Sequence, residues 1–152
     1  MNWPYSSATV HELVQAPKCF APGQSTAFAN VGEHGKELSA MLELVDGGLY
    51  HLKLIVSAGR ADLPESYEAS FLLNNRRVRG LGFSKIERKR KYKTHIPKGW
   101  HENIIDWNLP ASDDNHNRHP SIPDFAVTHL QDFLKKACLR WKIEIEYSDD
   151  LW

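Results

Sequence analysis

Three consecutive segments of the chain alternate between apolar and polar residues, and each is interrupted once by turn-forming residues. The segments are 37–59, 66–85 and 89–108, and the interruptions are Gly47-Gly48, Asn74-Asn75 and Lys98-Gly99. Alternation with a period of two is typical of strands with one buried face, and residues that tolerate positive φ favour tight hairpins. The sequence therefore predicts three successive hairpins, which form an antiparallel β-meander of about six strands.

A short helix is expected at the N-terminus. Thr9 followed by Glu12 is a capping-box pattern, and Pro17 ends the helix that begins there. Residues 18–36 contain Gly, Pro and Ala without a clear period, which predicts a loop.

A longer helix is expected near the C-terminus. Apolar residues recur at helical spacing between 128 and 141, and Thr128 with Gln131 supplies a capping box. Residues 142–147 alternate again and predict a short final strand. An amphipathic helix must bury its apolar stripe, so the sequence predicts a single α+β domain over residues 1–152, with the C-terminal helix packed on the sheet.

The composition is typical of a soluble globular protein, with 41% hydrophobic and 25% charged residues in a chain of 152. No apolar run is long enough for a transmembrane helix, and the first residues lack the pattern of a secretory signal. Cys19 and Cys138 lie far apart and outside any CxxC motif, so neither a thiolate zinc site nor a disulfide scaffold is expected. We therefore expect a cytoplasmic protein without a cofactor and without membrane contact.

The charges are unevenly distributed, although Lys+Arg and Asp+Glu both total 19. Residues 76–98 hold ten Lys and Arg against one Glu. Residues 1–75 hold four basic and eight acidic residues, and residues 99–152 hold five and ten. A basic block of this kind favours binding to a polyanion or to an acidic protein surface.

A strand through the basic block would carry charge on both faces. Arg88, Arg90, Tyr92 and Thr94 fall on one side, and Lys89, Lys91, Lys93 and His95 fall on the other. Cations with interleaved aromatic rings suit the phosphates and bases of a nucleic acid. The predicted nucleic-acid-binding residues are Arg77, Arg79, Arg88, Arg90, Lys91, Tyr92, Lys93 and Lys98. The alternative is an edge strand that its lysines protect from aggregation.

The candidates for chemistry are four histidines: His95, His101, His116 and His119. With Asp106 or Asp113 they would provide enough ligands for zinc or manganese. Alternatively, His95 and His101 would act as base and acid in metal-independent RNA cleavage, while Lys and Arg stabilise the charge on the phosphate. The third interpretation is a polar hairpin whose histidines only form hydrogen bonds.

The position of the third turn decides whether His95 and His101 share a face of the sheet. A two-residue turn at Lys98-Gly99 pairs Ile96 with His101 and leaves the two histidines on opposite faces. A three-residue turn that includes Pro97 pairs His95 directly with His101. Proline cannot donate a hydrogen bond to a strand partner, which favours its placement in the turn.

Two resemblances bear on function. The order His95, Asn108 and His116 or His119 resembles a histidine–asparagine–histidine nuclease finger, which implies that the first histidine activates water and the others help to hold one metal ion. The segments 97–108, 117–125 and 130–143 look like those of small bacterial and mobile-element proteins, similar in layout to TumE-like toxins. This second resemblance implies a bacterial or phage protein that targets RNA as a toxin and has an antitoxin as its partner.

These observations favour a small α+β protein that contacts nucleic acid, foremost RNA, through residues 76–98. Cleavage of that RNA by His95 and His101 would make it a ribonuclease. The alternative is a non-catalytic interaction module or inhibitor, which would use the same basic block to bind an acidic partner surface.

Overall fold

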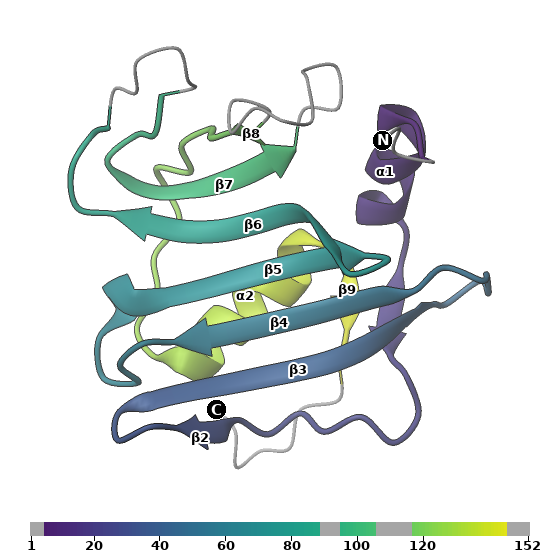
Figure 1. Ribbon diagram of the computed structural model, residues 1–152, viewed down its shortest axis with the longest axis horizontal. Helices are drawn as coiled ribbons and strands as arrows, with labels where there is room; N and C mark the ends of the chain where they lie inside the picture. The colour runs from purple at the N-terminus through teal and green to yellow at the C-terminus, as the bar shows by residue number, and fades with distance from the viewer. Residues whose placement is uncertain (1–4, 89–94, 106–116, 146–152) are drawn as a thin grey trace.

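The computed structural model describes residues 5–88, 95–105 and 117–145. Within these residues one nine-stranded sheet forms the centre and two helices lie against it (Figure 1). The helices are α1 (Ser7–Gln15) and α2 (Leu130–Arg140), and a 3-10 helix, η1, spans Pro64–Ser66. The strands are β1 (Lys18–Phe20), β2 (Ala29–Val31), β3 (Gly35–Leu44), β4 (Leu52–Ala58), β5 (Tyr67–Leu73), β6 (Arg76–Ser84), β7 (Gly99–Ile105), β8 (Asn117–Arg118) and β9 (Ile143–Glu144).

The strands lie in the order β8-β7-β6-β5-β4-β3-β1-β9, and β2 also pairs with β3. From β3 to β8 each strand pairs antiparallel with the next one along the chain, which forms a meander. β1 pairs antiparallel with β3, and β9 joins β1 in parallel, so the complete sheet is mixed. The predicted α+β class and its meander are therefore confirmed.

Two of the three predicted hairpins are present. β5 and β6 join through Asn74 and Asn75, whose φ angles are 49° and 64°. Two central residues at positive φ match the twist of the flanking strands. β3 and β4 join through a longer loop that contains Gly47 and Gly48, which also have positive φ.

The third predicted hairpin is wrong. β7 pairs with β6, so that His101 lies opposite Gly82 and Gly99 opposite Ser84. Residues 85–98 connect the two strands, and within this connection Arg88 pairs with Ile96. Neither a turn at Lys98-Gly99 nor one that includes Pro97 exists, so His95 and His101 are not cross-strand partners. The reason is that β7 pairs with β6 and packs Trp100 against the core, a long-range preference that turn residues do not reveal.

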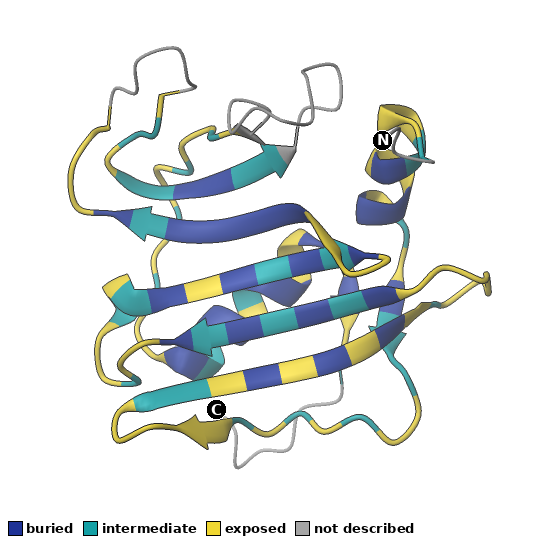
Figure 2. Ribbon diagram, viewed as in Figure 1, coloured by how far each residue is buried: buried dark blue, intermediate teal, exposed yellow. Residues whose placement is uncertain are grey.

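The sheet buries one face against the helices (Figure 2). Along β4 the buried residues alternate with partly exposed ones on the opposite face. The buried residues are Leu52, Leu54, Val56 and Ala58, and the partly exposed ones are Lys53, Ile55 and Ser57. Val10, Leu13 and Val14 of α1 and five residues of α2, including Phe133 and Cys138, are buried in the same core. The face that carries Lys53, Ile55 and Ser57 is called the open face below.

A buried lysine joins α1 to the sheet. Lys18 on β1 is fully buried, and its Nζ donates to the backbone carbonyls of Leu13, Val14 and Ala16 at 2.6, 2.9 and 2.6 Å. These carbonyls lie at the C-terminal end of α1, where helical partners are missing. Burial, followed by the charge of Lys142, lowers the pKa of Lys18 to about 8.

The helix starts differ from the prediction by a few residues. The N-cap of α1 is Ser6, whose side chain accepts a hydrogen bond from the Thr9 backbone N–H, so Thr9 is not the cap. The N-cap of α2 is His129, whose Nδ1 accepts from the Asp132 N–H, so Thr128 is not the cap.

Of the two remaining predictions, for residues 142–147 and for residues 18–36, one is confirmed and the other is partly wrong. The predicted final strand is confirmed in β9, whereas the predicted loop over 18–36 is wrong at β1 and β2. Each of those strands has only three residues, too few to show a period. In the described part of the chain, neither helix has the length and apolar character needed to cross a membrane.

Candidate functional site

β6 carries two glycines, Gly80 and Gly82, that face the open side of the sheet. On β7, Asn103 lies opposite Gly80 and His101 lies opposite Gly82. A Cβ placed on Gly82 would lie 3.8 Å from His101 Nε2, and one on Gly80 would lie 3.2 Å from Asn103 Nδ2. The missing side chains therefore leave a gap in the middle of the sheet, toward which both β7 side chains lean.

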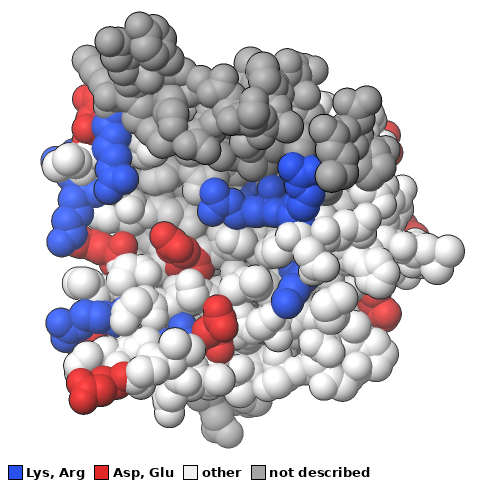
Figure 3. Space-filling view, in the orientation of Figure 1, with Lys and Arg blue, Asp and Glu red and all other residues white. Residues whose placement is uncertain are grey.

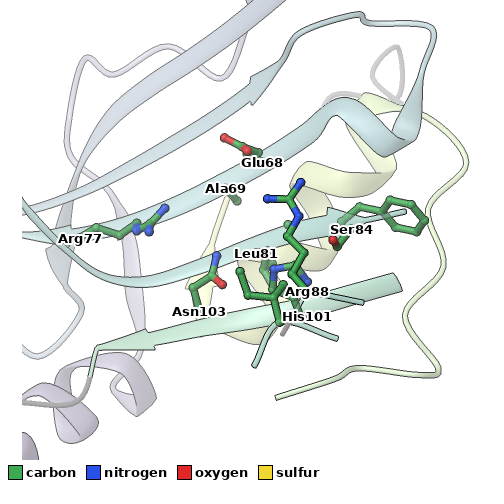
Figure 4. Close-up of a pocket in the computed structure, with 11 residues that line it drawn as sticks. Glu68, Ala69, Arg77, Leu81, Ser84, Arg88, His101 and Asn103 are labelled. Atoms are coloured by element: carbon green, nitrogen blue, oxygen red, sulfur yellow. The ribbon is translucent and has the colours of Figure 1, made fainter. Parts of the chain in front are cut away.

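A pocket of about 180 Å³ lies over this gap and is called the open-face pocket (Figure 4). Its polar lining comes from β5, β6, β7 and the β6–β7 connection. The lining side chains are Glu68, Arg77, Ser84, Arg88, His101 and Asn103. In Figure 4, Arg77 lies toward one end of the pocket and Arg88 lies beside His101. Two guanidinium groups thus share the pocket with one carboxylate, which leaves it with a positive charge.

His101 is held rigidly at the floor of the pocket. Only 7% of its surface is exposed, and its Nδ1 donates to the Gly99 carbonyl at 3.2 Å. This hydrogen bond leaves Nε2, the atom nearest to Gly82, as the acceptor of the neutral ring. Burial lowers the pKa of His101, and the positive charge of Arg88 adds to this effect. The imidazole is therefore mainly neutral at pH 7 and suited to accept a proton.

A second histidine lies next to His101. The pairing of Ile104 with Arg118 and the bridge from His101 to Ser121 place His119 opposite Asn103. The Asn103 Oδ1 accepts a hydrogen bond from His119 Nδ1 at 2.5 Å. The rings of His101 and His119 are 5.8 Å apart and nearly perpendicular, at 82°. The two imidazoles are therefore neighbours, but His119 is not among the residues that line the open-face pocket.

His95 lies outside this arrangement. It is not part of the lining of the open-face pocket, and its Nε2 lies 2.6 Å from Glu87 Oε1. Both side chains of this pair are about half exposed, at 49% and 52%. His95 therefore belongs to an exposed ion pair in the β6–β7 connection.

The predicted nucleic-acid-binding residues do not all lie on one surface. Arg77 and Arg88 line the open-face pocket, and Lys98 is exposed in the connection before β7. Arg79, in contrast, is only 9% exposed and lies on the helix side, where its Nε is 3.9 Å from Glu102 Oε2. The irregular register between β5 and β6 lies beside Val78 and accompanies this separation of Arg77 from Arg79. Arg90, Lys91, Tyr92 and Lys93 lie outside the described residues.

The predicted metal and nuclease-finger sites fall largely outside the described residues, which exclude Asp106, Asn108, Asp113 and His116. Within the described ranges, no group of three or more His, Cys, Asp and Glu side chains is placed to hold a metal ion.

The open face has an uneven charge distribution (Figure 3). Basic side chains gather toward the β6 side of the sheet, and acidic side chains lie below them and near the opposite edge.

The glycine pair and His119 were not recognised from the sequence as parts of one site. The two glycines of the segment Arg-Gly-Leu-Gly at 79–82 could have indicated the site, because glycine inside a strand often marks a position where a ligand or another backbone comes close.

No family model matches the chain, and no curated protein or solved structure matches it.

Proposed function

We propose that the protein binds single-stranded RNA across the open face and cleaves it at the open-face pocket. The observation that carries this proposal is that His101, Arg77 and Arg88 line the pocket over Gly80 and Gly82, while the ring of His119 lies 5.8 Å from that of His101. Two imidazoles supply a base and an acid, and two guanidinium groups attract and neutralise phosphate. In this proposal His119, and not His95, is the second histidine that acts together with His101.

The reaction we propose is a transesterification within the RNA. Neutral His101 takes the proton of a ribose 2′-hydroxyl, whose oxygen then attacks the adjacent phosphorus. The bond from phosphorus to the 5′-oxygen breaks, and protonated His119 gives its proton to that oxygen. The products are a 2′,3′-cyclic phosphate and a free 5′-hydroxyl. Arg77 and Arg88 stabilise the additional negative charge on the phosphate as it is attacked.

The hydrogen bond from Asn103 to His119 supports these roles. Because the Asn103 oxygen accepts from Nδ1, it fixes the orientation of the ring. The pKa of His101, lowered by burial, suits the base.

The test uses a labelled single-stranded RNA with the purified wild type and single variants. His119→Ala and His101→Asn should each reduce the cleavage rate by roughly 100-fold or more, the usual contribution of acid–base catalysis. A matched DNA should remain intact, because it lacks the 2′-hydroxyl. His95→Ala is the matched control and should cleave like the wild type. Loss of cleavage in His95→Ala together with normal cleavage by His119→Ala would contradict the proposed pair.

Binding is measured separately. Arg77→Ala and Arg88→Ala should weaken RNA binding at low salt, whereas Arg60→Ala, an exposed arginine paired with Asp62, should not. Binding without cleavage would favour a non-catalytic module, and unchanged binding in both pocket variants would remove the nucleic-acid proposal. If the protein acts as a toxin, its expression should slow growth and His119→Ala should relieve this effect.

A further inference from the structure

A second pocket, of about 410 Å³, lies where α1 and the C-terminal end of α2 meet β6 and β7. It is on the helix side of the sheet, since its lining includes Arg79 and Glu102, whose side chains pair there. We call it the helix-side pocket. It shares no lining residue with the open-face pocket.

The acid of the helix-side pocket is already neutralised. Glu102 is 7% exposed, and its Oε1 accepts hydrogen bonds from Arg140 Nε at 2.9 Å. Arg140 Nη2 also lies 2.8 Å from the same oxygen, so the guanidinium binds it through two nitrogens. The other oxygen, Oε2, accepts from Trp141 Nε1 at 3.0 Å. One arginine therefore balances the carboxylate, and both carboxylate oxygens have a close donor.

Two further cations are less completely paired with acids than Arg140 is. In the described part of the chain, the hydrogen bond of the Arg79 side chain is from Nη1 to the Val78 carbonyl at 2.9 Å, and its Nε is 3.9 Å from Glu102. Burial lowers the pKa of Arg79, which means that its cation lacks full solvation. Lys142 also lines the pocket and is exposed, and it forms no ion pair with the described carboxylates. The pocket therefore holds an excess of about two positive charges, with His11 at its rim.

Apart from Gln15, the rest of the lining is apolar. Val14 of α1, Ile104 of β7 and Leu139 of α2 contribute aliphatic side chains. Leu139 is 64% exposed although it belongs to the helix that packs on the sheet. A concave site with convergent cations and an apolar wall is typical of binding sites for small amphipathic anions.

We propose that the helix-side pocket binds a small organic phosphate monoester. Its phosphate dianion would lie between Arg79 and Lys142, and its organic part would cover Val14, Ile104 and Leu139. A guanidinium fork suits phosphate oxygens, and a dianion matches the excess of two cations. This inference does not depend on the function proposed for the open face.

Isothermal titration with adenosine 5′-monophosphate, inorganic phosphate and adenosine tests this site. The monophosphate should bind in a 1:1 ratio, and adenosine should bind at least about tenfold more weakly because it lacks the charge. Lys142→Glu, a charge reversal at an exposed residue, should weaken monophosphate binding by about tenfold or more. Arg79→Lys, which keeps the charge but loses the fork, should also weaken it.

Arg88→Ala is the control, because it changes the open-face pocket and should leave monophosphate binding unchanged. Absence of binding, equal binding by Lys142→Glu, or loss of binding in Arg88→Ala would each overturn the proposal. Competition by an RNA with a 5′-phosphate, but not by the same RNA with a 5′-hydroxyl, would support the proposal and identify the 5′ end of an RNA as the ligand. Binding without such competition would support it with a free small molecule as the source.

Discussion

At the scale of the residue, the protein buries several groups that can carry charge and satisfies each in a different way. Lys18 forms no ion pair with an acid among the described residues, but three helix carbonyls surround its ammonium group. His101 is kept neutral by burial and bonded to a backbone carbonyl. Burial of a polar group is tolerated only with such partners. These residues therefore make stability depend on specific contacts and on pH.

The first prediction concerns His101 and pH. Burial lowers its pKa in the folded protein, so the unfolded chain binds a proton more readily around the ordinary histidine pKa of about 6.5. The free energy of unfolding should therefore fall as the pH drops below about 6.5, and this contribution should be fully present above it. Urea unfolding from pH 5 to 8 should show a weaker dependence for His101→Gln than for the wild type. His51→Gln, at an exposed histidine, should behave like the wild type, and a slope shared by all three proteins would contradict the prediction.

The second prediction concerns Lys18. Lys18→Met removes three hydrogen bonds and leaves the carbonyls at the end of α1 without a donor, which should lower the free energy of unfolding by about 3 kcal/mol. Chemical denaturation at pH 7 measures this change. Lys53→Met, at a partly exposed lysine on the open face, should cost less than about 1 kcal/mol. Equal effects of the two substitutions would show that the carbonyl contacts of Lys18 do not stabilise the fold.

At the scale of the element, β6 serves two different purposes on its two faces. Leu81 is buried in the core, whereas Gly80 and Gly82 open the gap on the other side. Glycine weakens a strand because it has no side chain to pack. The paired β5 and β7 compensate, since β6 is bonded on both sides along most of its length.

The third prediction follows from this gap. A Cβ at Gly82 meets only His101 Nε2 at 3.8 Å, an ordinary contact, so Gly82→Val should fold. Its methyl groups should occupy the pocket and reduce the proposed RNA cleavage at least about tenfold, while a circular dichroism spectrum stays unchanged. Gly59→Ala, where an added Cβ lies 3.6 Å from the Ser66 Cβ, is the control with normal cleavage expected. Full activity of Gly82→Val would place the reaction elsewhere.

At the scale of the whole molecule, Glu102 connects the sheet to α2. It lies on β7, and its carboxylate accepts from Arg140 and Trp141 at the end of the helix. Trp141 is itself fully buried, and its ring lies 6.2 Å from that of Phe71 on β5. The hydrogen bond between Trp141 and Glu102, which are 39 positions apart, helps to hold the last helix on the meander.

The fourth prediction tests that connection. Glu102→Gln removes the negative charge next to Arg79 and Arg140 and should destabilise the protein by roughly 3 kcal/mol, as loss of one partner of a buried ion pair does. Thermal or urea unfolding measures the change. Glu87→Gln removes an exposed partner of His95 and should cost less than about 1 kcal/mol. A similar small effect at both positions would mean that the Glu102 network adds no net stability.

The meander and both helices could be predicted from the sequence because their signals are local. The alternation within each of the strands β3, β4 and β5, the Asn74-Asn75 turn and the apolar stripe of α2 each lie within a segment of 11 residues or fewer. The helix caps were displaced by one to three residues, because several neighbouring side chains can accept the same hydrogen bond.

The candidate site could be predicted only in part. His101, Arg77 and Arg88 were named from their residue types and line the open-face pocket. His119 lies beside His101 only because β7 pairs with the segment that follows β8. His95 pairs instead with Glu87, and Arg79 lies on the helix side near Glu102.

The sequence by itself therefore determined the class of fold, the turns of two of the three predicted hairpins and the region of positive charge. These depend on period, backbone preference and composition, which act over short distances along the chain. Only the tertiary structure decided which strand β7 joins, which face each arginine occupies and which histidines meet. Strand pairing is set by the burial of side chains from distant segments, and a shift of one residue moves every side chain to the other face.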